Sequence, residues 1–363
     1  LEDPRGSDAF TFVHVWDSRN GMRLVLPVKV FCLIALLLPQ SIPAALAQQP
    51  MVYRGICDAS AAVALGQNHF VVADDEADVL TIYRRGIPES VGRVDLTQYL
   101  GGRKPNGKAK ETDIEGAARI GNRIYWIASH SRDSKGRIAP ERFRLFATDV
   151  IETGTVPGVR ASESAPYAGL LSAIVADKRF DILAQASQFA AEDPRGLNIE
   201  GLAASSDGGL VIGFRNPRRA GMALTLKLRN PADVLERGSA PEFDDLVALD
   251  LGGRGIRSLE QVGNGYAIVA GPFDDGKGGP DDFALYTWSG KTASAPAPVA
   301  DVSLGTLHPE ALFKVPGLDQ LIILSDDGGE LVDGAKCKKK SVPGWKKGFR
   351  EIGIRVPAVL ARP

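Results

Sequence analysis

The chain has 363 residues, of which 44% are hydrophobic and 24% charged, and its formal net charge at pH 7 is −1. These values are ordinary for a soluble globular protein, and a charge so close to zero argues against a nucleic acid partner. A chain of this length can form one large all-β domain or two ordinary domains. Its 40 glycines and 23 prolines are scattered, which favours many turns between short strands over disorder.

The first segment predicted along the chain is a cleavable leader. Two basic residues follow Met22, an unbroken apolar run occupies residues 30–38, and Ala45-Leu46-Ala47 forms a small-x-small cleavage site. The apolar run is too short to cross a bilayer core of ~30 Å as a helix. We therefore predict an upstream extension at 1–21, a signal peptide at 22–47 and one folded domain at 48–363. The mature protein is expected in a periplasm or the medium, with no stable membrane insertion.

The remaining sequence repeats one hairpin pattern. Each copy has an acidic residue, a short apolar strand, a tight turn and a second β-prone run, which is typical of a β-hairpin. The copies lie at 55–76, 111–129, 196–214, 256–275 and 307–329. Third strands are predicted at 79–85, 143–150, 223–230 and 283–290, and fourth strands at 91–96, 246–251 and 298–304. The last repeat ends in a strand at 349–356.

Four short antiparallel strands repeated every ~50 residues predict an all-β fold, the β-propeller. One sheet cannot bury both its faces, whereas sheets stacked around an axis cover one another. Residues 165–194 have helical spacing and end in proline, so we interpret them as a helical insertion. We predict five four-stranded blades, with six as the fallback. The competing fold, a β-sandwich followed by another all-β domain, gives no reason for an acid at one fixed position in every repeat.

These acids are predicted to converge at one mouth of the central channel, because the first strand of each blade lines it. Converging carboxylates raise one another's pKa unless a cation lies among them. A hard divalent ion such as Ca²⁺ takes oxygen ligands in such a geometry. The predicted metal ligands are Asp58, Glu115, Glu200, Glu260 and Glu310.

The second strand of each hairpin ends at the same mouth, which adds further candidates. His130 is a candidate general acid or base, Arg215 an anion clamp, and Glu200 a residue that orients water. The further binding candidates are Asp75, Arg257, His308 and Asp326. In the alternative interpretation, the arginines and histidines are internal cations that pair with the acids, and the ring serves the fold alone.

Two cysteines remain after leader cleavage. Cys57 and Cys337 lie near opposite ends of the domain, and in an oxidising compartment they could pair. Alternatively they are unrelated thiols, one in a strand and one in the Lys-rich loop 336–347, which we interpret as solvated. Pairing requires spatial proximity, so the sequence leaves both possibilities open.

As a set, the motifs "ETDIEG", "GLNIEGLA", "DLGGRGIRSLE" and "LHPEAL" resemble an uncharacterised bacterial β-propeller family, a domain of unknown function, over roughly residues 53–330. More distantly, the chain is similar to the esterase-like phytase propellers. The distant similarity implies a hydrolase of phosphoesters or esters, assisted by calcium. It transfers no catalytic residue, because no catalytic motif is matched.

Two functional hypotheses follow. The first is a metal-assisted hydrolase of phosphoesters, esters or lactones. The second is a propeller that binds a small ligand or a partner in the cell envelope at the same mouth, without chemistry. The sequence has no GxSxG, HExxH or phosphate-loop motif, which disfavours the hydrolases and nucleotidases that these motifs define.

Overall fold

The structure, a computed structural model, describes residues 50–103, 107, 110–152, 154–273 and 282–361. The described residues form one compact unit. The predicted upstream extension and signal peptide lie outside the described residues. Within them, no helix has the length and apolarity needed to span a membrane.

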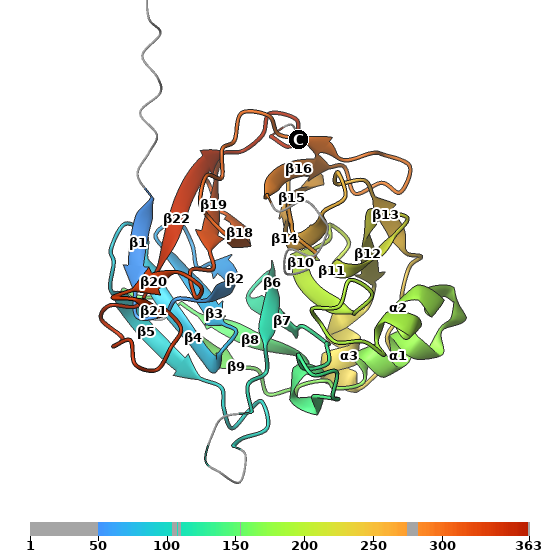
Figure 1. The fold of residues 1–363 in the computed structure, drawn as a ribbon, viewed down its shortest axis with the longest axis horizontal. Helices are drawn as coiled ribbons and strands as arrows, with labels where there is room; N and C mark the ends of the chain where they lie inside the picture. Colours follow the sequence, from blue (N-terminus) through green and yellow to red (C-terminus); the bar gives the residue numbers. More distant parts are fainter. Residues whose placement is uncertain (1–49, 104–106, 108–109, 153, 274–281, 362–363) are drawn as a thin grey trace, which may run out of the picture. The chain divides into compact units, whose positions relative to one another are not determined.

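Five four-stranded sheets surround a central axis, as the five-bladed propeller prediction requires (Figure 1). Blade 1 consists of β2 (Ala59–Ala64), β3 (His69–Asp74), β4 (Ala77–Arg84) and β5 (Ser90–Asp95). Blade 2 consists of β6 (Ile114–Ile120), β7 (Arg123–Ala128), β8 (Leu145–Ile151) and β9 (Gly158–Ala161). Blade 3 consists of β10 (Asn198–Ala204), β11 (Leu210–Arg219), β12 (Met222–Leu228) and β13 (Val247–Leu249). Blade 4 consists of β14 (Gly255–Val262), β15 (Gly265–Gly271), β16 (Ala284–Trp288) and β17 (Ala297–Pro298).

Blade 5 joins the two ends of the propeller. It consists of β18 (Pro309–Lys314), β19 (Gln320–Ser325), β22 (Gly348–Arg355) and β1 (Met51–Arg54). Strand β1 pairs antiparallel with β22, so the first strand of the domain becomes the outermost strand of the last blade. The pairing closes the ring with backbone hydrogen bonds. The sequence analysis did not predict a strand at 51–54.

The innermost strands, β2, β6, β10, β14 and β18, contact one another in that order, and β18 contacts β2. Apolar side chains fill the spaces between neighbouring blades. Between blades 5 and 1, for example, Tyr53, Phe70 and Phe313 are buried together with their rings 5.0–5.3 Å apart. Burial on this scale is the main favourable term for the fold.

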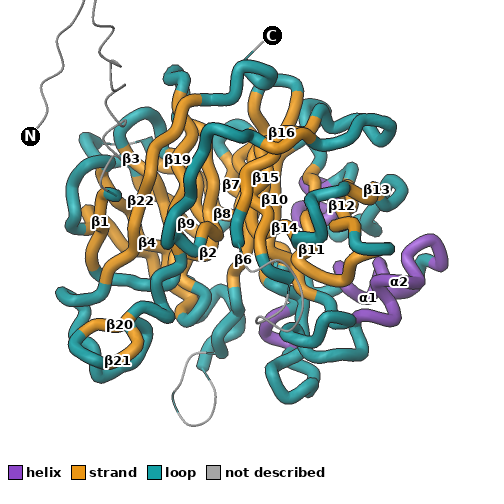
Figure 2. Tube along the Cα trace, turned by 45° about the horizontal axis from the view of Figure 1, so that its top comes forward, coloured by secondary structure: helices purple, strands orange, loops and turns teal. Residues whose placement is uncertain are grey.

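The predicted insertion at 165–194 is helical. It contains α1 (Leu170–Ala176), a 3₁₀ helix (Lys178–Phe180) and α2 (Asp181–Ala186), which pack on blade 3 through Leu170, Phe180 and Leu183. Two further short helices were not predicted: a 3₁₀ helix (Pro140–Arg142) and α3 (Pro231–Arg237). Figure 2 shows α1 and α2 at one side of the propeller and a small hairpin, β20 (Leu331–Val332) and β21 (Ala335–Lys336), at the other.

The two cysteines form a disulfide, with a Cα–Cα distance of 6.0 Å. It joins the residue before Asp58, at the entry to blade 1, to the loop between β19 and β22 of blade 5. Of the two possibilities that the sequence left open, the structure shows the paired one.

Candidate functional site

Each innermost strand has a β-bulge near its start. The bulge inserts one extra residue that has no partner in the neighbouring strand, and we call its place the bulge position. In blade 2, Ile114 pairs with Ala128 and Gly116 with Ile127, so Glu115 has no partner in the ladder. The same irregularity recurs in every blade, and the extra residues are Ser60, Glu115, Glu200, Arg257 and Glu310. Bulges re-aim a side chain out of the regular alternation.

This register shows that two of the predicted acids, Asp58 and Glu260, do not occupy the bulge position. The sequence analysis aligned Asp58 and Glu260 with the other acids, but in the structure Ser60 and Arg257 occupy the bulge position of these blades. Asp58 precedes the bulge position by two residues, and Glu260 follows it by three. The repeats were aligned on their acidic residues, and the sequence does not show where the strand register shifts. The ring therefore contains three glutamates, one serine and one arginine.

Arg257 neutralises two of the three ring glutamates. Its Nε lies 3.0 Å from Oε2 of Glu200, and its Nη2 pairs with Glu310. Glu200 also accepts a hydrogen bond from Asn198 (2.8 Å) and pairs with Arg215 (3.2 Å). On this side of the axis the arginines are internal cations, as the alternative interpretation of the sequence expected.

On the side of blades 1 and 2, carboxylates outnumber the cations that pair with them. Two groups of three acids each bring one carboxylate oxygen per residue within 4.8 Å of the others. The first group is Asp75, Asp113 and Glu115, and the second is Asp58, Asp74 and Asp75. We call these five residues the mouth cluster. Asp75 belongs to both triads. The predicted site residues Asp58, Asp75 and Glu115 are thus brought together with two acids, Asp74 and Asp113, that were not selected as site residues.

The mouth cluster has few hydrogen-bond and ion-pair partners. Asp113 pairs with Arg142 (2.9 Å), and Asp74 accepts a hydrogen bond from the backbone of Glu76 (3.0 Å). Within the described part of the chain, no group donates a hydrogen bond to Asp75 or Glu115. The Oδ1 atoms of Asp58 and Asp75 are buried without a hydrogen-bond partner. Such atoms are rare in folded proteins and point to a missing cation or water.

Burial and mutual repulsion make full ionisation of this cluster costly. Burial, followed by repulsion from Asp326 and Asp74, raises the pKa of Asp58 to about 8. Burial raises the pKa of Asp74 to about 6, and the pKa values of Asp75 and Glu115 lie well above the ordinary range for the same two reasons. A bound cation would favour the charged form of every one of them.

The disulfide holds one cation over the cluster. Lys338 follows Cys337, and its Nζ lies 2.8 Å from Oε1 of Glu76 and 3.9 Å from Oδ1 of Asp58. The sequence analysis missed Lys338, because it interpreted the whole lysine run as solvated. The available signal was adjacency: a Cys57–Cys337 bond necessarily brings the residues after each cysteine, Asp58 and Lys338, into the same region.

The remaining candidates lie elsewhere or at the rim. His130 is 1% exposed, donates a hydrogen bond from Nδ1 to the Ala128 carbonyl (2.8 Å) and packs on Phe143. Burial lowers its pKa to about 4, so it is neutral at pH 7 and shielded from substrate. His308 is half exposed, 3.8 Å from Glu330. Asp326 faces the cluster closely enough to raise the pKa of Asp58.

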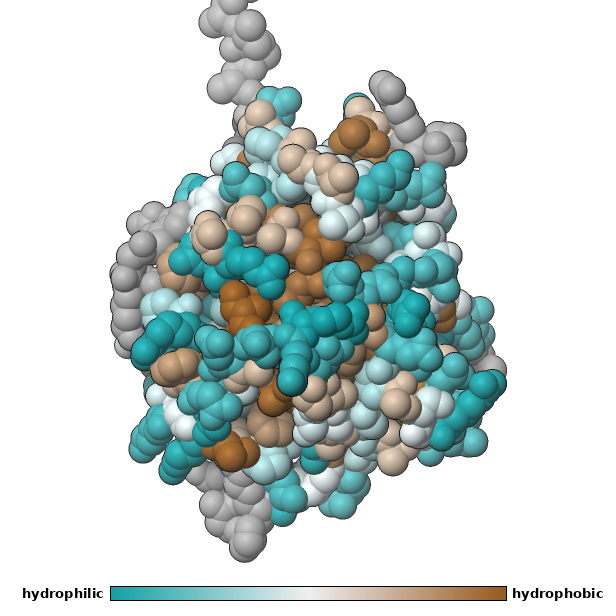
Figure 3. Space-filling model, turned by 90° about the vertical axis from the view of Figure 1, so that its right-hand side faces the viewer, coloured by the Kyte–Doolittle hydropathy of each residue, from teal (hydrophilic) through white to brown (hydrophobic). Residues whose placement is uncertain are grey.

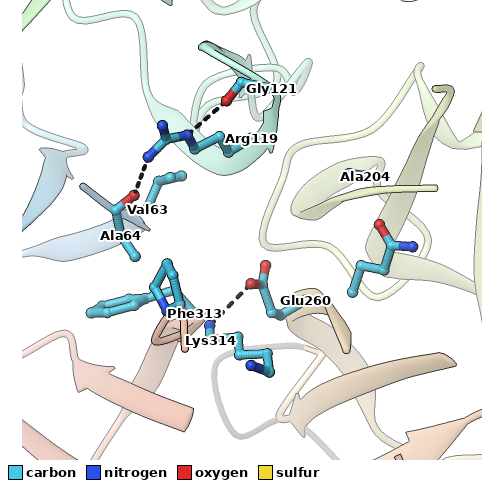
Figure 4. A pocket seen from close by; sticks show the side chains of 10 residues that line it. Val63, Ala64, Arg119, Gly121, Ala204, Glu260, Phe313 and Lys314 are labelled. Atoms are coloured by element: carbon cyan, nitrogen blue, oxygen red, sulfur yellow. Dashed lines mark hydrogen bonds between the residues drawn. The ribbon is translucent and has the colours of Figure 1, made fainter. Parts of the chain in front are cut away.

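Glu260 lies at the other end of the channel, which we call the far end. There a cavity of about 330 Å³ is lined by residues from all five innermost strands, Ala64, Arg119, Ala204, Gln261 and Lys314 among them. Figure 4 shows Glu260 accepting a hydrogen bond from the backbone N–H of Lys314 (3.0 Å), opposite Arg119. Burial raises the pKa of Glu260 to about 7. The structure therefore separates Glu260 from the other predicted ligands.

A larger cavity, of about 750 Å³, opens on the side of the propeller between blades 3 and 4. Its charged lining residue Lys227 pairs with Asp207 (2.5 Å) and Asp244 (3.8 Å). The face in Figure 3 is mostly hydrophilic, with hydrophobic residues in a central hollow. Because Lys227 is paired with two acids and no group of possible metal ligands among the described residues lies here, this cavity is a weaker candidate than the mouth.

Comparison with known proteins matches one family profile to part of the chain. The profile of a family described as "Protein of unknown function (DUF3616)" matches residues 162–317, in agreement with the predicted resemblance to an uncharacterised propeller family. No curated protein matches the sequence.

Similar solved structures include an oxidoreductase described as a glucose dehydrogenase from Thermus thermophilus (13% identity, 84% of this chain and 100% of that chain, TM-score 0.39). They also include the PQQ-bound aldose sugar dehydrogenase of Streptomyces coelicolor (10%, 84% and 98%, 0.39). A third is the β-propeller domain of Cps50 from Myceliophteria thermophila (9%, 76% and 96%, 0.34). At these identities and TM-scores, the similarities carry no information on function.

Proposed function

We propose that the protein is an exported hydrolase of phosphoesters, carboxylate esters or lactones that depends on a divalent cation, Ca²⁺ in the first place, bound at the mouth cluster. The observation that carries this proposal is the triad of Asp75, Asp113 and Glu115. Three carboxylate oxygens lie within 4.8 Å of one another, and among the described residues Asp75 and Glu115 have no hydrogen-bond or close ion-pair partner.

The spacing suits the ion. Ca²⁺ binds oxygen at about 2.3–2.6 Å, so two ligands on opposite sides of it lie about 4.6–5.2 Å apart. The triad fits within that span. Water and substrate would complete the six to eight oxygen ligands that Ca²⁺ takes. Carboxylates without nitrogen or sulfur donors favour a hard cation over zinc or copper.

A cation held here would lower the pKa of water and polarise an ester oxygen. In hydrolysis the water oxygen bonds to the phosphorus or acyl carbon, the bond to the alcohol oxygen breaks, and the released proton ends on that oxygen. The protein's own residues position the reactants. Asp113, paired with Arg142, presents a fixed carboxylate, while Lys338 adds a positive charge at the rim that attracts an anion. His130 takes no part, because it is buried.

Export rests on two features. The disulfide between Cys57 and Cys337 is typical of an oxidising compartment, and the predicted signal peptide leads to one. The similarity to esterase-like phytase propellers supports the reaction class as a resemblance and no further.

The alternative is a cation-dependent binding propeller without chemistry. One observation favours it: the candidate general acid or base, His130, is shielded from the mouth, and Glu200 is held by Asn198 and two arginines. The two functions share the cation site and differ in turnover.

The test combines metal binding with a substrate panel. We expect the purified mature protein to bind Ca²⁺ in calorimetry and to hydrolyse chromogenic phosphate esters, carboxylate esters or a lactone, with activity lost on chelation. Asp75→Asn should abolish both, while the matched variant Glu260→Gln, at the far end, should retain both. Ca²⁺ binding without turnover of any ester would favour the binding propeller. No Ca²⁺ binding, or equal loss in both variants, would contradict the cation site.

A further inference from the structure

We propose that the mouth cluster holds two divalent cations, and that the carboxylate of Asp75 bridges them. The inference deepens the proposed function and rests on it. The two triads of closely spaced oxygens are distinct except for Asp75, which belongs to both. A carboxylate has two oxygens and can therefore serve two ions at once.

The fold builds the two triads from different segments. Asp58, Asp74 and Asp75 all belong to blade 1, at the entry to β2 and the end of β3. Asp113 and Glu115 come from the entry and the bulge of β6 in blade 2. Asp113 has a φ of 62°, in the left-handed region that aspartate tolerates better than most residues. The site thus crosses the boundary between two blades, with Asp75 at the junction.

The two triads together contain two buried oxygens that lack a hydrogen-bond donor, one on Asp58 and one on the shared Asp75. The first of these oxygens is Oδ1 of Asp58, a residue that is 3% exposed, and the closest cation, Nζ of Lys338, is 3.9 Å away. Asp75, which the triads share, has a buried Oδ1 in the same condition. A buried charged group without a partner is costly, so positive charge is favoured beside Asp58 and beside Asp75, the residue through which both triads meet.

The balance of charge agrees with two ions. Carboxylates around the cluster outnumber the cationic side chains that pair with them. The carboxylates are Asp58, Asp74, Asp75, Glu76, Asp113, Glu115 and Asp326, and the cations are Lys338, Arg142 and Lys347, the last of which acts on Asp74. Arg215 and Arg257 are engaged by Glu200 and Glu310. One divalent ion leaves a clear negative excess, and two remove it.

A third group of potential ligands shows what a satisfied cluster looks like. His308, Asp327 and Glu330 also have ligand atoms within 4.8 Å of one another. However, Arg350 pairs with both Asp327 (2.6 Å) and Glu330 (3.6 Å), and Ser325 donates a hydrogen bond to Asp327 (2.7 Å). We therefore do not include it among the cation sites.

Two adjacent cations also specify the ligand. A phosphate group can place separate oxygens on the two ions and so be held at both, as in two-metal phosphoesterases. A neutral carboxylate ester offers a single carbonyl oxygen. Among the esters of the proposed function, phosphoesters are therefore expected to be the best substrates.

The test is the stoichiometry of Ca²⁺ on the full mature chain, measured by calorimetry and elemental analysis after gel filtration. We expect two ions per chain in the wild type and in Glu260→Gln. Asp74→Asn and Asp113→Asn should each keep one ion and bind the other at least tenfold more weakly. Asp75→Asn should weaken both. Thermal melting shows whether each variant is folded. If Asp75→Asn does not fold, the ion counts of Asp74→Asn and Asp113→Asn still test whether two ions bind.

The outcomes separate the two proposals. One ion in the wild type, lost equally in all three aspartate variants, would overturn the bridged pair and leave a single-ion hydrolase standing. Two ions that disappear independently of Asp75 would also overturn the bridge. Two ions without turnover of any phosphoester would support the paired site and contradict the proposed reaction.

Discussion

The two ends of the central channel are formed by the same five strands, but they differ in how charge is matched. At the far end, Arg119 donates to the carbonyls of Ala64 (3.0 Å) and Gly121 (2.9 Å), and Glu260 accepts from Lys314. At the mouth, Asp75 and Glu115 have no such partner among the described residues. Backbone hydrogen bonds satisfy Arg119 and Glu260 at the far end, whereas the side of the mouth at blades 1 and 2 has an excess of carboxylates, which marks it as the better candidate for a ligand site.

The largest expected effect comes from breaking the matched half of the mouth. Arg257 pairs with both Glu200 and Glu310, and its side chain is buried. Arg257→Met removes the cation that pairs with Glu310 and leaves Glu200 with Arg215 alone, which should cost about 3–5 kcal/mol of the free energy of unfolding. Urea denaturation measures this. The additional replacements Glu200→Gln and Glu310→Gln should recover much of the loss, and a triple variant no more stable than Arg257→Met would contradict the ion-pair explanation.

Removal of the disulfide should be the next largest effect. A crosslink across 280 residues restricts the unfolded chain, and replacing Cys57 and Cys337 by serine should cost about 2–5 kcal/mol. The β1–β22 pairing still closes the ring, so the variant should remain folded at 25 °C. The melting temperature with and without reductant provides the measurement: reductant should lower it in the wild type and leave the variant unchanged.

A smaller, pH-dependent effect is expected at the far end. The folded-state pKa of Glu260, about 7, lies above the ordinary 4.5, so the folded state holds a proton that the unfolded state loses. The contribution of Glu260 is most favourable below pH 4.5 and diminishes as the pH rises to 7. Glu260→Gln should therefore stabilise the protein by about 1–3 kcal/mol at pH 8 and change little at pH 4. A stabilisation that is equal at both pH values would contradict this pKa.

The sequence predicted the blades and the insertion because hairpin turns and alternating apolar runs are local signals. The strand β1 was missed, since its pairing with β22 depends on a contact across the whole domain. The bulge position was predicted correctly at Glu115, Glu200 and Glu310. It was wrong at Asp58 and Glu260, because a bulge shifts the register without leaving a sequence signature. Aligning the repeats on their acidic residues therefore misaligned blades 1 and 4.

The pairing of charges at the site was harder to predict from the sequence than the fold. Arg257 was recognised as a cation beside the ring, but its central position between Glu200 and Glu310 follows from the bulge alone. Lys338 belongs to a run of similar lysines, and only the disulfide distinguishes it from Lys339. Pairing between distant residues is set by tertiary structure, and no local pattern encodes it.

The smallest predicted effect is a change in Ca²⁺ affinity when Lys338 is replaced, and it would sharpen the contrast between the two ends of the channel. Lys338 supplies one of the few positive charges near the cluster and stands 3.9 Å from Asp58. Its side chain is 39% exposed, so solvent weakens its repulsion of a bound cation. Lys338→Met should therefore bind Ca²⁺ roughly three- to tenfold more tightly in calorimetry, while Lys339→Met should match the wild type. Weaker binding in Lys338→Met would mean that the lysine orders the ligands instead of competing with the ion, because loss of a competing charge can only favour a cation.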